Sequence, residues 1–238
     1  RHFIALGAAL PWSVHAQGSK PMRLIVPFTP GGSTDILARA IAPKLGAALG
    51  QNVIIDNKPG AGGSLRAGEA ARADPDGQTL LMGHIGTLAV NPAIYAKLSY
   101  DPIRSFAPVA WVARVPNVLV VPASSPAKSF KEFVERARAQ PGKYTFSSGG
   151  NGSAAHITFE YLKLRAGLFM LHIPYRGTAP SVTDLIAGQV DATFTGAPAV
   201  LPHVKSGRLR ALAVSSPQRI PALPDVPTVA ESGYPGFE

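Results

Sequence analysis

The stretch that decides the fold is Val26-Pro27-Phe28-Thr29-Pro30-Gly31-Gly32-Ser33-Thr34-Asp35. Residues 23–26, which lead into it, form a short, β-branched and largely apolar run bounded by prolines, and such a run predicts a buried strand. After it, apolar residues recur at helical spacing as far as Leu45, and the Ser-Thr-Asp triplet has the chemistry of a helix N-cap. The stretch therefore predicts a strand that leads through bare glycines into a helix.

This glycine turn has two interpretations. Glycines let the backbone come close to a ligand, and the free amides and positive dipole end of the following helix suit an anion. A tight strand-to-helix turn with ordinary capping explains the same residues. A single glycine-rich turn is a weak motif, so taken alone the stretch favours the second interpretation.

The same unit recurs along the chain. Further strands are expected at 53–56, 79–82, 109–114, 117–121, 144–148, 171–175, 190–195 and 209–214. Helices are expected at 65–72, 91–96, 129–138, 154–166 and 197–206, with one more that ends at 187. This alternation predicts an α/β fold with parallel sheets flanked by helices. Pro43 predicts that the first helix bends or ends early at its far end.

Composition excludes several classes of protein. A hydrophobic content of 46% with 16% charged residues in a chain of 238 residues predicts a folded protein with a sizeable core. The absence of cysteine excludes disulfides, thiolate metal sites and a cysteine nucleophile, and the six histidines lack metal-ligand spacing. The formal net charge is +9, but the basic residues are scattered. We therefore expect a basic surface that attracts anionic solutes, and no nucleic-acid site.

The first seventeen residues resemble the end of a secretory signal peptide. An apolar run at 3–12 follows Arg1, and Val14-His15-Ala16 is a small-x-small cleavage pattern. The alternative is a buried N-terminal element. Because the chain lacks cysteine, export predicts the periplasm, with cleavage near Ala16.

Two enzyme hypotheses arise from the second half of the chain. Gly150-Asn151-Gly152-Ser153-Ala154-Ala155 fits a dinucleotide fingerprint between a strand and a helix, but Tyr175-Arg176 stands where an acidic ribose ligand is expected. Ser153, His156 and Asp191 suggest a hydrolase, although the chain has no Gly-x-Ser-x-Gly elbow. An α/β enzyme that binds a nucleotide at Gly150–Ala155 stays an alternative.

The order of the motifs resembles one family, over roughly residues 20–238. It is similar to the tripartite tricarboxylate transporter receptors, the Bug-type periplasmic solute-binding proteins. The residues that carry the resemblance are Pro27–Asp35, Asn57–Gly63, Asp74–Leu80, Asn91-Pro92, Pro174–Gly177, Gly188–Asp191 and Leu201–His203.

The resemblance implies a two-lobed periplasmic-binding fold of type II-like form, each lobe a mostly parallel sheet flanked by helices. Lobe 1 would comprise residues 20–104 and 217–238, with its C-terminal part apparently missing, and lobe 2 residues 105–216. The implied function is a monomeric receptor, not an enzyme, that needs no cofactor or metal. It would capture a di- or tricarboxylate, an aromatic acid or an acidic amino acid and deliver it to membrane permease subunits. An orphan carboxylate sensor is a further alternative.

The binding residues implied by the resemblance come from glycine loops of both lobes. From lobe 1 they are Phe28, Pro30, Gly31, Gly32, Ser33, Thr34, Asp35, Gly63, Ser64, His84 and Thr87. From lobe 2 they are Ser147, Ser148, Gly149, Gly150, Asn151, Gly152, Ser153, Tyr175, Gly177 and Asp191. Asp35 is expected to cap its helix; if it faces the cleft, it favours a solute with an amino or hydroxyl group.

Two positions depart from the family pattern. His84 stands where smaller or amide residues are usual, and Phe194-Thr195-Gly196 stands where a polar pair is common. Both departures are expected to affect which solute fits.

Overall fold

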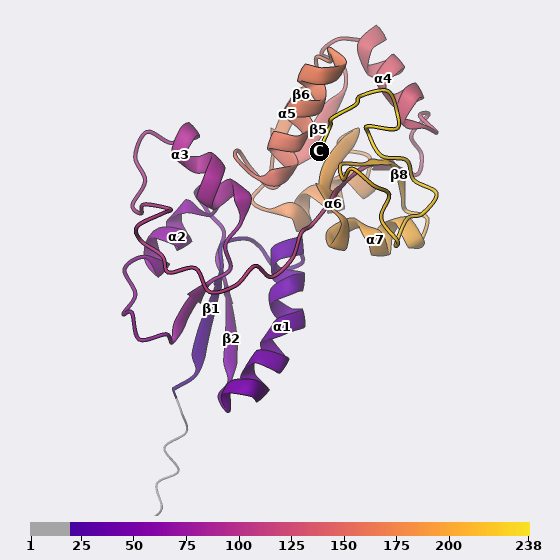
Figure 1. Cartoon of the computed structure of the whole chain (residues 1–238). Coiled ribbons are helices and arrows are strands. Elements are labelled where there is room, and N and C mark those ends of the chain that lie inside the picture. Colours follow the sequence, from indigo (N-terminus) through magenta and orange to yellow (C-terminus); the bar gives the residue numbers. More distant parts are fainter. Residues whose placement is uncertain (1–19) are drawn as a thin grey trace, which may run out of the picture.

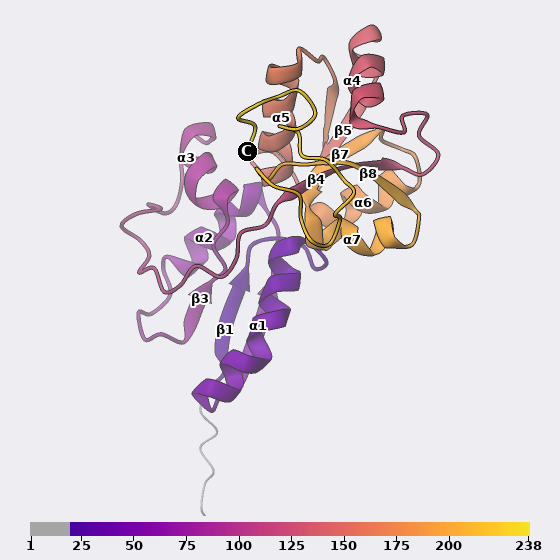
Figure 2. The same ribbon diagram turned by 45° about the vertical axis from the view of Figure 1, so that its right-hand side comes forward.

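The computed structural model describes residues 20–238, so the signal-peptide prediction lies outside the described residues. Figures 1 and 2 show two lobes joined side by side. The first lobe contains a parallel sheet in the order β2-β1-β3, made of β1 (Met22–Val26), β2 (Val53–Asn57) and β3 (Thr79–Leu81). Helix α1 (Ser33–Leu49) covers one face, and α2 (Ser64–Ala70) and α3 (Asn91–Ile94) lie on the other. Short turns η1 (Ala61–Gly63) and η2 (Gly86–Val90) precede α2 and α3.

Helix α1 continues past its internal proline. It runs to Leu49 and ends at Gly50, whose left-handed backbone donates its N–H to the Gly46 carbonyl. The expectation that Pro43 stops the helix early is therefore wrong. At the other end the N-cap is Gly32, and the side chain of Asp35 accepts the Gly31 N–H at 2.8 Å.

The second lobe is built on a five-stranded sheet in the order β6-β5-β7-β4-β8. Its strands are β4 (Asn117–Pro122), β5 (Thr145–Ser148), β6 (Leu171–Pro174), β7 (Ala192–Gly196) and β8 (Leu209–Val214). Four strands run in one direction, and β4 is antiparallel to both β7 and β8. All of β4 is buried, and its residues alternate between two cores because successive side chains point to opposite faces.

Helices cover both faces of this sheet. On one face α4 (Phe130–Ala139) and α5 (Ala154–Ala166) enclose a core that includes Phe133, Phe146, Phe159 and Phe194. On the other face α6 (Thr178–Ile186) and α7 (Ala197–Lys205) pack against the alternate residues of β4. These layers bring the carboxyl ends of β5 and β7 to the edge that faces lobe 1.

Residues 109–114 do not form the expected strand. They belong to an extended connection that crosses from lobe 1 to β4, and Val109 and Trp111 are 79% and 77% exposed. β-branched and aromatic residues form a strand only where a neighbouring strand takes up their backbone hydrogen bonds. In residues 20–238 no strand pairs with this connection.

Residues 217–238 were expected in lobe 1, and the structure places them against lobe 2. Val229 and Phe237 enter the core that contains Phe194, and Leu223 enters the core on the opposite face. The cause is a short parallel bridge between Thr228 and Val214, which ties the tail to β8.

Candidate functional site: a pocket between the lobes

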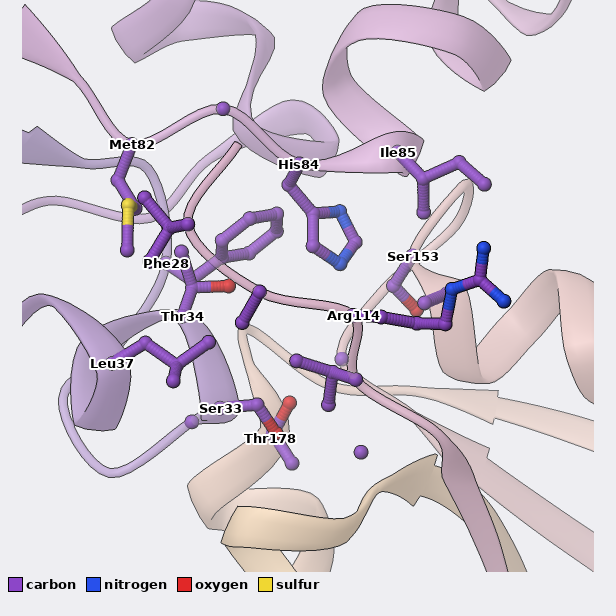
Figure 3. Close-up of a pocket in the computed structure, with 18 of the residues that line it drawn as sticks. Phe28, Ser33, Thr34, Leu37, Met82, His84, Ile85, Arg114, Ser153 and Thr178 are labelled. Atoms are coloured by element: carbon purple, nitrogen blue, oxygen red, sulfur yellow. The ribbon is translucent and has the colours of Figure 1, made fainter. Parts of the chain in front are cut away.

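A pocket of about 610 Å³ lies between the lobes. Lobe 1 contributes the loops after β1 and β3 and the start of α1, and lobe 2 contributes the starts of α5, α6 and α7. Residues 110–115 of the connection complete the wall. Figure 3 shows side chains from these separate segments pointing into one space.

Four helix N-termini converge on this pocket. Gly32, Ser153 and Gly196 are the N-caps of α1, α5 and α7, Thr178 is the first residue of α6, and all four residues line the pocket. Each N-terminus carries the positive end of a helix dipole. Their convergence makes the pocket attractive to an anion.

The N-termini of α1 and α5 also offer free hydrogen-bond donors. The first amides of a helix have no intrahelical acceptor. Within residues 20–238 the amides of Ser33, Thr34, Ala154 and Ala155 have no other acceptor either. At α7 the corresponding donor is already used, because the Ala197 N–H donates to the Pro116 carbonyl.

The charges of the lining agree with an anionic ligand. The lining includes no aspartate or glutamate and one cationic side chain, Arg114, whose guanidinium lies 5.6 Å from the centre of the Trp111 ring. The described part of the chain holds no cluster of side chains suited to a metal ion. Donors from the backbone therefore dominate the polar chemistry of the pocket.

The wall from lobe 1 is mainly apolar. It includes Leu37, Met82, Ile85 and Leu88, with His84 among them. The His84 ring meets the Phe28 ring edge-to-face, with centroids 4.8 Å apart, and burial lowers the pKa of His84 to about 4. The pocket thus combines an anion-attracting side with an apolar side.

Seven of the residues implied by the resemblance line the pocket. They are Phe28, Gly32, Ser33, Thr34, His84, Gly149 and Ser153. Both departures from the family pattern are also at the pocket, since Thr195 and Gly196 line it together with His84.

Asp35 lies outside the lining. It is 2% exposed and accepts hydrogen bonds from the Gly31 N–H and from Arg39 Nε at 3.0 Å. Burial alone would raise the pKa of Asp35, but these hydrogen bonds outweigh it and hold the pKa below its usual value. The carboxylate therefore orders the loop that precedes α1.

Gly63, Ser64 and Thr87 form a support behind the pocket. Ser64 Oγ accepts a hydrogen bond from Asn91 Nδ2 at 2.8 Å, and Thr87 Oγ1 donates to the Gly62 carbonyl at 3.1 Å. A Cβ on Gly63 would collide with Thr87 Oγ1. The three residues are thus engaged within lobe 1 and line no part of the pocket.

Three polar residues of lobe 2 are also used internally. Ser147 is fully buried and accepts a hydrogen bond from Ser181 Oγ, and Ser148 Oγ lies 2.7 Å from His172 Nε2. The Tyr175 hydroxyl donates to Asp184 at 2.7 Å. Burial and this hydrogen bond raise the pKa of Tyr175 to about 12.

Asp191 lies at the edge of the sheet opposite the pocket. Its carboxylate accepts hydrogen bonds from the N–H and hydroxyl of Thr145, at 2.7 and 2.9 Å, where β5 begins. The pocket lies at the other end of β5, next to Gly149. Asp191 precedes the first residue of β7, whereas the pocket is lined by Thr195 and Gly196 at the end of that strand. The interpretation of Asp191 as a ligand contact is therefore corrected.

The remaining predicted glycines lie where the lobes touch. A Cβ on Gly177 would collide with Thr29 Oγ1, and one on Gly31 would lie 3.4 Å from Ala179. On the other flank a Cβ on Gly152 would lie 2.6 Å from Asn91 Oδ1. Pro30, Gly150 and Asn151 belong to the same two loops, and like these glycines they are outside the lining. The lobes thus meet closely at glycine positions on both sides of the pocket, where the absence of a Cβ makes room for a side chain of the other lobe.

Thr178, Asn117 and the connection 110–115 also line the pocket, and no sequence motif predicted them. Thr178 had a signal, since it follows a glycine at a helix start. Asn117 and the connection had none, because only the crossing of the chain between lobes brings them to the pocket.

The enzyme hypotheses find little support in this geometry. The loop before α5, where a pyrophosphate would lie, packs against lobe 1 through Gly152. His156 Nδ1 accepts the Gly152 N–H, and Ser153 Oγ accepts the His156 N–H as an N-cap. Asp191 is at the far edge of the sheet, so the three residues form no catalytic triad.

Two α/β lobes around a pocket lined by helix N-termini define a solute-binding protein of the periplasmic type. The family comparison agrees with this class. Residues 37–238 match the model of the tripartite tricarboxylate transporter family receptor. The chain belongs to this family, as its motifs predicted.

Individual relatives extend the comparison. BugT of Bordetella pertussis is 41% identical over 237 residues, which cover 99% of this chain and 73% of that protein. The solved structure of R. palustris Rpa4515 with adipate has a TM-score of 0.90 and 39% identity, and covers 93% of this chain and 74% of that one. MatC from Rhodopseudomonas palustris with bound malate has a TM-score of 0.86 and 34% identity, with coverage of 92% and 74%. The matches to these curated relatives cover nearly all of this chain but only about two thirds to three quarters of the relatives' own length.

Proposed function

We propose that this protein is a periplasmic receptor that captures a small carboxylate between its lobes and delivers it to a tripartite tricarboxylate-type permease. The convergence of four helix N-termini on a pocket without acidic lining residues is the observation that carries this proposal. Relatives of similar fold hold adipate and malate, which are both carboxylates. In the described part of the chain no helix has the length and apolar character of a membrane span.

The donors in the pocket are sufficient for useful affinity. A dissociation constant of 1 μM requires about 8.2 kcal/mol of net binding free energy. Hydrogen bonds to a charged oxygen contribute about 1.5–3 kcal/mol each, and a helix N-terminus adds about 0.3–1 kcal/mol. In the upper part of these ranges, four free amides from α1 and α5, together with the Ser33 hydroxyl, reach this value after association costs of about 4 kcal/mol or more. Ser33 Oγ is buried and has no partner within the described residues.

A thermal-shift screen tests the proposal. Mono-, di- and tricarboxylates, aromatic acids and acidic amino acids are compared with NAD(P) at equal concentration. Stabilisation follows RT ln(1 + [L]/Kd), so we expect at least one acid to raise the unfolding temperature while NAD(P) has no effect. Stabilisation by NAD(P) alone would support the nucleotide-binding enzyme instead.

Delivery to a permease needs its own test. Only closed lobes present both lobe surfaces together, so we expect permease subunits to retain the receptor in a pull-down when its solute is present. The control is the receptor without solute. A carboxylate that binds tightly without any permease association would favour the orphan-sensor alternative.

A further inference from the structure

His84 projects into the pocket from the loop after β3, and its two ring nitrogens have different environments. Figure 3 shows the imidazole between Phe28 and Arg114, directed toward the centre of the pocket. Nδ1 accepts the Gly86 N–H at 3.0 Å. This hydrogen bond leaves the proton of a neutral ring on Nε2, because Nδ1 must offer its lone pair.

The ring is neutral at ordinary pH. Burial lowers the pKa of His84 to about 4, and no charged side chain contributes to this shift. The pocket's single cation, Arg114, lies on the connection and stacks over Trp111. His84 is therefore an uncharged donor that titrates far below the pH of the periplasm.

Nε2–H has no acceptor among residues 20–238. The His84 ring contacts the Phe28 ring, and the other side chains that its own loop and the following turn contribute to the lining, Met82, Ile85 and Leu88, are apolar. A lone donor on an apolar wall loses hydration when a solute fills the pocket, unless the solute returns an acceptor. The solute that satisfies this wall is apolar with one well-placed oxygen.

An uncharged oxygen fits this position better than a second carboxylate. A carboxylate buried beside His84 would receive one hydrogen bond from a neutral ring, while the guanidinium of the nearby Arg114 is stacked over Trp111. One such hydrogen bond does not offset the desolvation of an ion. The four helix N-termini satisfy one carboxylate on the other side of the pocket. The two sides therefore differ in the charge they accept.

We propose that His84 determines the specificity of this pocket, and that the solute is a monocarboxylate with an apolar body and a distal hydroxyl or carbonyl oxygen. This inference rests on the proposed carboxylate-binding function. The carboxylate lies at the helix N-termini, and the distal oxygen accepts the Nε2–H of His84.

Calorimetric titration with hexanoate, 6-hydroxyhexanoate and adipate tests the proposal, because these acids differ only in the group at the far end. Benzoate, 4-hydroxybenzoate and terephthalate repeat the test with a ring. We expect the hydroxy acid of at least one series to bind about fivefold to tenfold more tightly than both partners, as one neutral hydrogen bond implies.

Variants separate the two nitrogens of His84. His84→Asn keeps an acceptor for the Gly86 N–H and removes the distal donor, so we expect the preference for the hydroxy acid to fall to about onefold. His84→Gln places an amide N–H near the position of Nε2, so the preference should remain. His203→Gln, on α7 outside this pocket, is the matched control and should leave all six affinities unchanged.

Tighter binding of the dicarboxylate in both series, or a preference that survives in His84→Asn, would overturn the inference and leave the proposed function intact. If none of the acids binds, and the wider acid screen is also negative, the proposed function itself fails.

Discussion

Asp191 joins two strands of lobe 2 at the edge of the sheet opposite the pocket. Its carboxylate satisfies both the N–H and the hydroxyl of Thr145. We expect Asp191→Ala to lower the free energy of unfolding by about 1–3 kcal/mol, because it removes the acceptor for a backbone donor. The dissociation constant for the best acid should change less than twofold. Urea denaturation and calorimetric titration measure the two quantities, and a large loss of affinity with full stability would contradict this assignment.

His172 links the stability of lobe 2 to pH. Its ring stacks on Phe146 and His156, with centroids 4.8 and 4.3 Å apart. Burial, with a further contribution from His156, lowers the pKa of His172 to about 4. In the unfolded chain the ring titrates near 6.5. Between these values the unfolded state binds more protons, so the free energy of unfolding rises with pH.

The measurable consequence lies in mildly acidic solution. As the pH falls from 6.5 to 5, we expect the free energy of unfolding to fall by about 1 kcal/mol. This figure is smaller than the full pKa difference would give, because the ring is partly solvated. His172→Phe keeps the stacking and removes the titration, so denaturation curves of this variant should depend less on pH. Identical slopes for the variant and the parent would show that His172 is not responsible.

Two helices of lobe 2 begin in the same way but face different surroundings. Ser129 caps α4 and Ser153 caps α5, each by accepting the amide three residues later. Replacing either serine by alanine should lower the free energy of unfolding by about 1 kcal/mol. Ser153 lines the pocket and Ser129 does not. Only Ser153→Ala should therefore weaken acid binding, and equal effects of the two variants on affinity would count against the pocket.

Turn η2 of lobe 1 meets the loop before α5 of lobe 2 at a glycine. Gly86 has a backbone conformation open to any residue, since its φ is not in the left-handed range, but a Cβ there would collide with the Gly152 carbonyl across the lobes. We expect Gly86→Ala to weaken solute binding about tenfold or more while the unfolding temperature without solute changes little. Unchanged affinity would mean that this contact is unnecessary for binding.

For the whole molecule, contact between the lobes on both flanks of the pocket corresponds to a closed arrangement. A solute shifts the balance between open and closed forms only as far as it binds the closed form better. Small-angle scattering should therefore show a smaller radius of gyration when a binding acid is added, and less compaction for Gly86→Ala. The absence of compaction with an acid that binds tightly would exclude closure as the signal.

Much of the fold was predictable because it rests on local chemistry. The glycine turn at Gly31-Gly32 and the helix beyond it follow from cap residues and apolar spacing, and the strand–turn–helix units of lobe 2 follow in the same way. The strand expected at 109–114 failed because a strand also needs a partner, and pairing is not local. Residues 217–238 were assigned to the wrong lobe because Val229 and Phe237 are apolar enough for either core.

The candidate site was predictable in part for the same reason. Gly32, Ser33, Gly149 and Ser153 line the pocket, and the sequence predicted them because strand ends and helix starts can be recognised from residue type and spacing. Tyr175 has a hydroxyl that could bind a ligand, but this hydroxyl donates a hydrogen bond to Asp184 within its own lobe. That Thr178 faces the pocket followed only from the way α6 packs in lobe 2.

The sequence by itself determined the strand-to-helix glycine turns and the family, since these depend on residue type and spacing. Tertiary structure alone decided which of those turns line the pocket and which press the lobes together. The physical reason is that a glycine backbone approaches a ligand and a neighbouring lobe equally well. Only the relative position of the two lobes determines which of them it meets.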